Sequence, residues 1–105
     1  MKSFEPYYVA IFTSKRTGED EEGYGLMDEK MFGLVEDQAG FMGAESFSNS
    51  EGKNVTIVKF RTKEEMIDWR NNPAHREAQT KGREIWYEFY NVKICHVERE
   101  YEFIK

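Results

Sequence analysis

The sequence predicts an α+β domain with a four-stranded antiparallel sheet and helices on one face. Three observations favour this class. The patterns follow the order strand, helix, strand, strand, helix, strand (βαββαβ), 105 residues support one modest core, and 39% of them are hydrophobic. Because crossover connections in a sheet are right-handed, both helical segments are expected on the same face. We treat residues 1–105 as one domain, with a core of about residues 7–97 and a C-terminal extension at 98–105.

The first half of the chain supplies the first strand and the first helix. Tyr7–Ser14 is rich in Tyr, Val, Ile and Phe, which is typical of a strand. The acidic run Glu19–Glu22 follows in a loop, where carboxylates favour a helix start more than a metal site. Apolar residues recur at helical spacing over Tyr24–Val35, and Gly40 is expected to end that helix.

A hairpin and a short helix follow. Phe41–Ser48 and Val55–Phe60 are predicted to be strands, joined by the turn residues of Glu51–Asn54. Thr62 has a glutamate three residues later, at Glu65, which is the capping-box pattern of a helix start.

The next helical segment carries the candidate site. Asn72 is a preferred N-cap residue and Pro73 suits the first helical position, so we expect a helix from Pro73 to about Ile85. The last strand is expected over Tyr87–Val97. One stripe of this helix combines polar and aromatic side chains, as the rim of a small-molecule pocket does: His75, Gln79, Arg83 and Trp86.

Charge and composition exclude several classes of protein. The net charge of −5, and the lack of a basic-aromatic signature in Val55–Phe60, argue against nucleic-acid binding. The apolar runs are too short to cross a membrane, and Met1–Pro6 has no apolar signal segment, so we expect a cytoplasmic protein. Cys95 is the only cysteine and is expected to be a small buried hydrophobic residue. His96 has no His or Cys nearby in sequence other than Cys95, which makes it a poor metal ligand.

The strands are apolar on both faces, although helices are expected on only one. In Tyr7–Phe12 both alternating sets of side chains are apolar or aromatic, and the last strand behaves likewise. Such an uncovered sheet face is typical of an interface. We therefore expect a homodimer joined sheet to sheet, with the segment Glu98–Lys105 reaching toward the partner.

Two segments carry a family resemblance. The Gly-Phe-x-Gly-x-Glu run within Gln38–Ser46 and the Trp-Arg-x-x-Pro-x-His-x-x-Ala-Gln run within Trp69–Tyr90 resemble the antibiotic biosynthesis monooxygenase family. The resemblance covers roughly residues 7–97. It implies the ferredoxin-like, dimeric α/β-barrel fold, with a pocket between sheet and helices in each subunit. Some members oxygenate anthrones or quinols with O₂ and no bound flavin or metal, and others degrade haem.

The resemblance implies a cofactor-independent monooxygenase that acts with O₂ on a small aromatic or quinol-like substrate. Such chemistry needs a dry pocket, one proton acceptor and donors for a developing oxyanion. We assign His75 as the base and Trp69 as a catalytic wall and N–H donor. Gln79, Arg83 and Trp86 are assigned to substrate binding, with neither metal nor cofactor.

Each assignment has an alternative. Trp69 and Trp86 also suit core packing, His75 suits an exposed first helical turn, and Arg83 has neighbouring glutamates with which to pair. The protein as a whole also suits a non-catalytic dimeric binder of small molecules or a stress-associated protein. Haem degradation is disfavoured because Gln79 stands where that branch has its axial histidine, and the first strand has no Asn.

Overall fold

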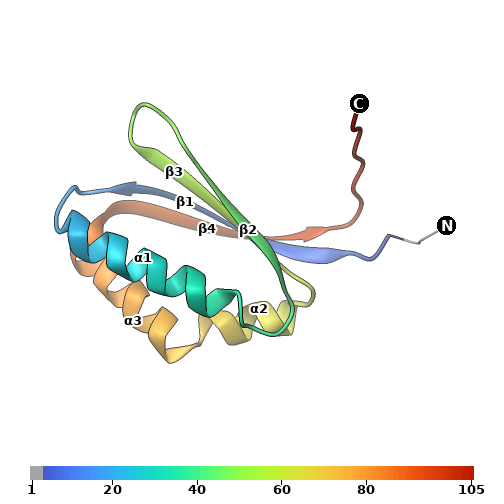
Figure 1. The fold of residues 1–105 in the computed structure, drawn as a ribbon, viewed down its shortest axis with the longest axis horizontal. Coiled ribbons are helices and arrows are strands. Elements are labelled where there is room, and N and C mark those ends of the chain that lie inside the picture. Colours follow the sequence, from blue (N-terminus) through green and yellow to red (C-terminus); the bar gives the residue numbers. More distant parts are fainter. Residues whose placement is uncertain (1–3) are drawn as a thin grey trace.

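The computed structural model describes residues 4–105, so Met1, Lys2 and Ser3 of the expected domain and N-terminal segment lie outside the described residues. The sheet is antiparallel with strand order β2-β3-β1-β4, which confirms the predicted α+β, ferredoxin-like class. The elements in chain order (Figure 1) are β1 (Tyr7–Arg16), α1 (Glu21–Val35), β2 (Phe41–Ser48), β3 (Lys53–Phe60), α2 (Lys63–Arg70), α3 (Pro73–Lys81), the π-helical turn η1 (Gly82–Trp86) and β4 (Tyr87–Val97).

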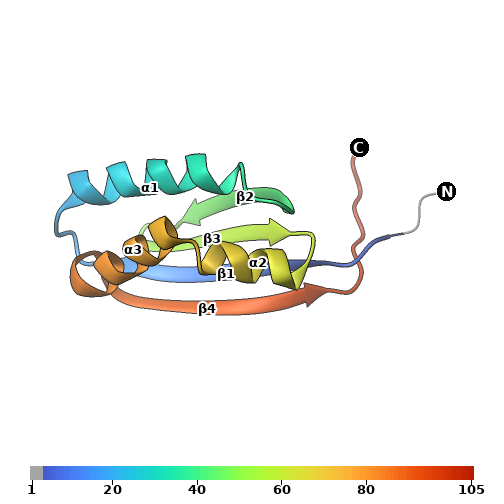
Figure 2. The same cartoon turned by 90° about the horizontal axis from the view of Figure 1, so that it is seen from below.

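All helices lie on one face of the sheet. Figure 2 shows α1 along the β2–β3 side and α2 with α3 over β1, whereas no helix covers the edge strand β4. The buried core lies under these helices and consists of Val35, Phe60, Met66 and Trp69. Phe60 at its centre has no exposed surface. The helices therefore cover the sheet less completely over β4 than over the other strands.

The strand register assigns each side chain to a face. Tyr8 pairs with Phe60 and with His96, so these three side chains share the helix-covered face. Val9 and Ile11 belong to the opposite face, where no helix packs. Both faces of β1 are thus apolar, as the alternating pattern predicts.

The first helix differs from its predicted bounds at both ends. It begins at Glu21, because Asp20 adopts a left-handed conformation (φ 50°) and its side chain accepts a hydrogen bond from the Gly23 N–H. It ends at Val35, and Gly40 is not its cap. Gly40 instead has φ +80° immediately before β2, in the left-handed region that favours glycine.

The helix predicted to reach Ile85 is wrong in its last turn. The α-helical part ends at Lys81, and the wider turn η1 follows over Gly82–Trp86. Gly82 is buried, and a Cβ there would lie 2.8 Å from the ring of Tyr87. The missing side chain therefore lets the first residue of β4 pack directly against η1, a tertiary contact that periodicity does not report.

Candidate functional site

A cavity of about 790 Å³ lies between the helices and the sheet. Its volume is within the usual range for small-molecule sites. All five predicted site residues line it: Trp69, His75, Gln79, Arg83 and Trp86. The structure thus brings together side chains from α2, α3 and η1, while their chemical roles stay predictions.

His75 is held by two contacts with Trp69. The imidazole stacks on the indole, with ring centroids 4.4 Å apart and an interplanar angle of 14°. Its Nδ1 lies 3.1 Å from the Trp69 carbonyl oxygen. Asn72 positions the segment between them, because its side chain accepts from the backbone N–H groups of Ala74 and His75 and so caps α3.

The shorter of two contacts at Nδ1 indicates the tautomer of His75. The Trp69 carbonyl oxygen, which only accepts hydrogen bonds, lies 3.1 Å from Nδ1, whereas the Gln79 amide nitrogen lies 3.5 Å away, so we infer that Nδ1 carries the hydrogen and Nε2 keeps its lone pair. Burial lowers the pKa of His75 below its ordinary value of 6.5, and the hydrogen bond to Trp69 partly opposes that shift. The imidazole is therefore neutral near pH 7, with Nε2 available as a proton acceptor.

Gln79 and Arg83 continue the polar stripe of α3. The Gln79 side-chain amide donates to the Arg70 carbonyl oxygen at 3.1 Å, which ties α3 to the end of α2. The Arg83 Nη1 lies 3.4 Å from the Tyr90 hydroxyl on β4. Within residues 4–105 Arg83 forms no ion pair, so the predicted alternative of a glutamate partner is not observed.

Both tryptophans are buried and also line the cavity. Trp69 is 7% exposed and belongs to the core, so its packing role and its position in the cavity wall are both observed. Trp86 is 4% exposed, and its indole N–H donates to the Asp20 carboxylate at 3.3 Å. That N–H is already used, so Trp86 offers a ligand only its ring.

Comparison with known proteins gives the family. The chain is 38% identical over 95 residues to the uncharacterized protein YqjZ of Bacillus subtilis (strain 168), a match that spans 90% of this chain and 82% of YqjZ. The chain belongs to the YqjZ family. No family model matches the sequence.

Solved structures show that this YqjZ-family chain has the fold of antibiotic biosynthesis monooxygenases, as its motifs indicate. SnoaB of Streptomyces nogalater, a cofactor-independent oxygenase, superposes with a TM-score of 0.72 at 8% identity, covering 92% of this chain and 97% of SnoaB. A protein of Nitrosomonas europaea assigned as an antibiotic biosynthesis monooxygenase superposes with a TM-score of 0.70 at 10% identity, covering 90% and 92%. At these identities the likeness establishes the fold.

The cavity of this YqjZ-family protein also contains an aromatic cluster that sequence reasoning missed. Phe12 stacks on Tyr90 with centroids 5.4 Å apart, and Tyr87 packs edge-on against both Phe12 and Tyr24. The alternation of β1 and β4 places Phe12 and Tyr90 on one face, but only the tertiary fold adds Tyr24 from α1. The cluster gives the cavity flat apolar walls at the end away from His75 and Trp69.

One carboxylate, Asp28, lies beside this aromatic cluster. Burial raises the pKa of Asp28, and the Arg16 guanidinium partly offsets the shift. Burial also raises the pKa of Tyr87, helped by its hydrogen bond with Tyr24. Tyr87 therefore stays a neutral phenol at physiological pH.

The described residues bear on two other predictions. Among residues 4–105, no group of three or more His, Cys, Asp or Glu side chains is arranged to hold a metal ion. In the same part of the chain, no helix has the length and apolar character that crossing a membrane requires.

Proposed function

We propose that this YqjZ-family protein is a cofactor-independent monooxygenase for a small aromatic or quinol-like substrate. The observation that carries the proposal is His75, a neutral histidine whose Nδ1–H is held by the Trp69 carbonyl in the wall of an apolar cavity. A base with a fixed tautomer and a lowered pKa is suited to removing a proton near neutral pH. The cofactor-independent activity of SnoaB, which shares the fold, supports the same chemistry.

The reaction balances without a bound cofactor. His75 Nε2 removes a proton from an acidic CH₂ group between two aromatic rings, and the resulting carbanion transfers one electron to O₂. Recombination forms a C–O bond to give a peroxide anion. The remaining C–H proton moves to the outer peroxide oxygen as the O–O bond breaks, which gives a ketone and hydroxide. The hydroxide then takes the first proton back from His75 and leaves as water. The sum is R₂CH₂ + O₂ → R₂C=O + H₂O.

The other predicted site residues bind the substrate or shield it from water and take no proton themselves. Gln79 and Arg83 lie on the same stripe as His75 and are suited to donate hydrogen bonds to the phenolate or carbonyl oxygen of the substrate. Trp69 supplies a rigid wall and holds the base, and Trp86 supplies an aromatic face. Exclusion of water by these rings protects the carbanion until O₂ reacts with it.

The proposed active form is a homodimer joined through the helix-free face of the sheet. That face carries a central apolar group consisting of Val9, Ile11, Val55, Ile57 and Cys95. The segment 98–105 leaves the sheet on the side opposite the helices (Figure 1), with its apolar side chains Tyr101, Phe103 and Ile104 more than 80% exposed. The radius of gyration is 15.0 Å, against roughly 13 Å for a compact 100-residue domain, because the terminal segments extend away from the sheet (Figure 1).

Sedimentation equilibrium tests the dimer. The unmodified protein is expected to be a dimer at micromolar concentration, and Ile11→Glu to produce folded monomer because a charge would be buried in the interface. Leu26→Glu, on the exposed surface of α1, is the matched control and should remain dimeric. A soluble, well-folded monomer of the unmodified chain contradicts the proposed assembly.

Oxygen uptake tests the activity. Metal-free protein is mixed with a panel of anthrones, quinols and haem, and O₂ consumption and products are compared with protein-free controls. We expect protein-dependent uptake with at least one anthrone or quinol and none with haem. If every rate equals the protein-free rate while ligands still raise the melting temperature, the protein is a non-catalytic binder and the oxygenase proposal is wrong.

A further inference from the structure

The cavity differs in charge from the chain as a whole. The chain has 20 acidic and 15 basic residues and a net charge of −5. Three of the cavity-lining residues, Lys63, Arg70 and Arg83, carry a positive charge, whereas Asp28 is the one lining carboxylate. An acidic protein therefore has a cavity whose lining is net positive.

These three cations lack acidic partners in the part of the chain that the structure describes. The ion pairs found within residues 4–105 involve other cations: Lys15, Arg16, Arg61 and Lys81. Lys63, Arg70 and Arg83 are also solvent-exposed, so their charges are free to meet a ligand at the cavity mouth. Positive charge at the mouth of a cleft raises the local concentration of anions.

Two of the cations, Arg70 and Arg83, lie near Gln79 of the polar stripe. Arg70 follows Trp69, and its carbonyl accepts the Gln79 side-chain amide. Arg83 lies four residues beyond Gln79, and its guanidinium reaches toward Tyr90 on β4. The opposite side of the mouth is apolar, because Val92 and Ile94 of the helix-free edge strand are 48% and 49% exposed. The mouth thus has a cationic helix side and an apolar strand side.

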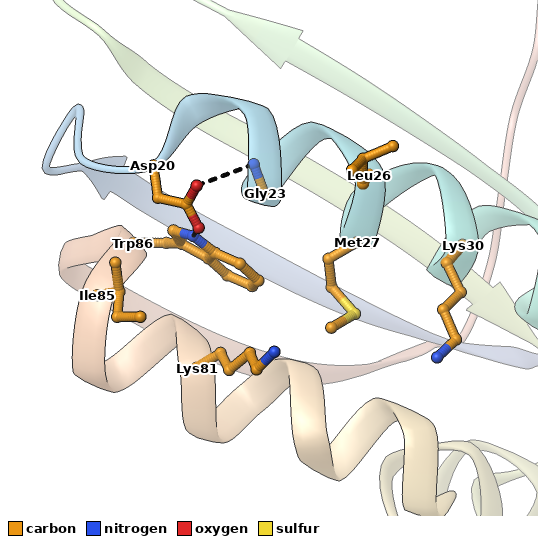
Figure 3. A pocket seen from close by; sticks show the side chains of 8 residues that line it. All are labelled: Asp20, Gly23, Leu26, Met27, Lys30, Lys81, Ile85 and Trp86. Carbon is orange, nitrogen blue, oxygen red and sulfur yellow. Dashed lines mark hydrogen bonds between the residues drawn. The ribbon is translucent and has the colours of Figure 1, made fainter.

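A second hollow of about 320 Å³ adjoins the cavity and also carries positive charge. It lies between α1 and the α3–η1 segment, and Met27 and Trp86 line both spaces. Figure 3 shows Lys30 and Lys81 extending toward this hollow from the two helices. Its carboxylate, Asp20, is already engaged with Trp86 and with the N-terminus of α1.

We propose that the cavity binds an aromatic carboxylic acid, with its rings against the apolar walls and its carboxylate between Arg70 and Arg83. The guanidinium group matches a carboxylate with two parallel N–H donors, which an uncharged isostere cannot use equally. This inference rests on the proposal that the cavity holds an aromatic substrate, and it specifies the class of that substrate. Lys63 and, in the second hollow, Lys30 add long-range attraction, whereas the charge of Lys81 is offset by its ion pair with Glu77.

Calorimetric titration under anaerobic conditions tests the inference, with 1-hydroxy-2-naphthoate as the acid and 1-hydroxy-2-naphthamide as its neutral isostere. We expect the acid to bind about fivefold or more tightly than the amide, because two exposed charge pairs each contribute a modest gain. Arg70→Gln and Arg83→Gln should each weaken binding of the acid roughly two- to fivefold. Arg70→Gln should leave binding of the amide unchanged, whereas Arg83→Gln, which also removes the hydrogen bond proposed for a substrate oxygen, should weaken the amide less than the acid. Raising the salt concentration should weaken binding of the acid and leave binding of the amide unchanged.

Arg76→Gln is the control, because Arg76 is an exposed arginine of α3 that does not line the cavity. It should leave both affinities unchanged. Equal affinity for acid and amide, or unchanged binding of the acid by both the Arg70 and the Arg83 variant, overturns the inference. Because no O₂ is present, tight binding of the acid together with a failed oxygen-uptake assay would reject the oxygenase and leave the acid site standing.

Discussion

Replacing His75 by phenylalanine separates its chemistry from its packing. In the unmodified protein the His75 and Trp69 rings stack with centroids 4.4 Å apart. A phenyl ring at position 75 can keep this stacking, but it lacks both ring nitrogens. General-base catalysis contributes about 10²–10⁴-fold to a rate. We therefore expect His75→Phe to lower turnover by that factor, equivalent to roughly 2.7–5.5 kcal/mol of transition-state stabilisation.

The cost in stability should be much smaller. The variant loses one hydrogen bond, from Nδ1 to the Trp69 carbonyl at 3.1 Å. That carbonyl also accepts from the Asn72 N–H at 3.1 Å, so it is not left without a partner. The expected loss is about 0.5–1.5 kcal/mol, or roughly 2–12 °C in melting temperature for a domain of this size.

The assay is O₂ uptake with the best substrate of the panel, with thermal unfolding measured on the same samples. His96→Phe is the matched control, because His96 also stacks on an aromatic ring, that of Tyr8, with centroids 4.7 Å apart, and has no assigned role. It should keep a turnover close to that of the unmodified protein. If His75→Phe retains turnover, or if both variants lose it equally, His75 is not the base.

Three further predictions concern pH and stability. The unfolded chain binds a proton at His75 more tightly than the folded chain, because folding lowers the pKa of His75. The free energy of unfolding should therefore rise with pH from the lowered folded pKa up to about 6.5 and then stay level. In urea titrations at different pH values, His75→Phe should abolish this rise. Trp86→Phe keeps an aromatic side chain but removes the part of the buried indole whose N–H bonds Asp20, so it should cost at least about 0.5–2 kcal/mol in urea unfolding. An unchanged midpoint would show that this bond contributes nothing. Gly40→Ala should destabilise the protein, because φ is +80° and the new Cβ would displace the Glu65 carboxylate, which accepts a hydrogen bond from the Thr62 hydroxyl. Gly33→Ala, in open space within α1, should instead stabilise it by up to about 1 kcal/mol, and thermal melts that rank the two variants in the opposite order would refute this account.

Much of the fold could be predicted from the sequence because its signals are local. Asn72 and Thr62 cap helices through hydrogen bonds to backbone groups two or three residues away, so the sequence shows where α3 and α2 begin. The alternation in β1 and the helical spacing in α1 likewise depend on neighbours along the chain. The stripe of α3 that supplies two of the candidate site residues, His75 and Gln79, follows from the same periodicity.

Other features depended on contacts between distant segments. The turn η1 forms where Gly82 meets the ring of Tyr87, and periodicity alone extends an α-helix through it. Tyr24 from α1 joins the cavity only because the fold brings its ring against that of Tyr87, the first residue of β4. The types of these residues do not by themselves specify contacts between segments that are far apart in the sequence.

What the sequence by itself determined is therefore the order of elements, the helix caps and the identity of the residues at the cavity rim. Only the tertiary structure decided the chemical state of His75, because its tautomer and its lowered pKa come from the Trp69 carbonyl and from burial. The physical reason is range: propensity and capping act within one helical turn, whereas desolvation and hydrogen bonding in a site depend on every segment that packs around it.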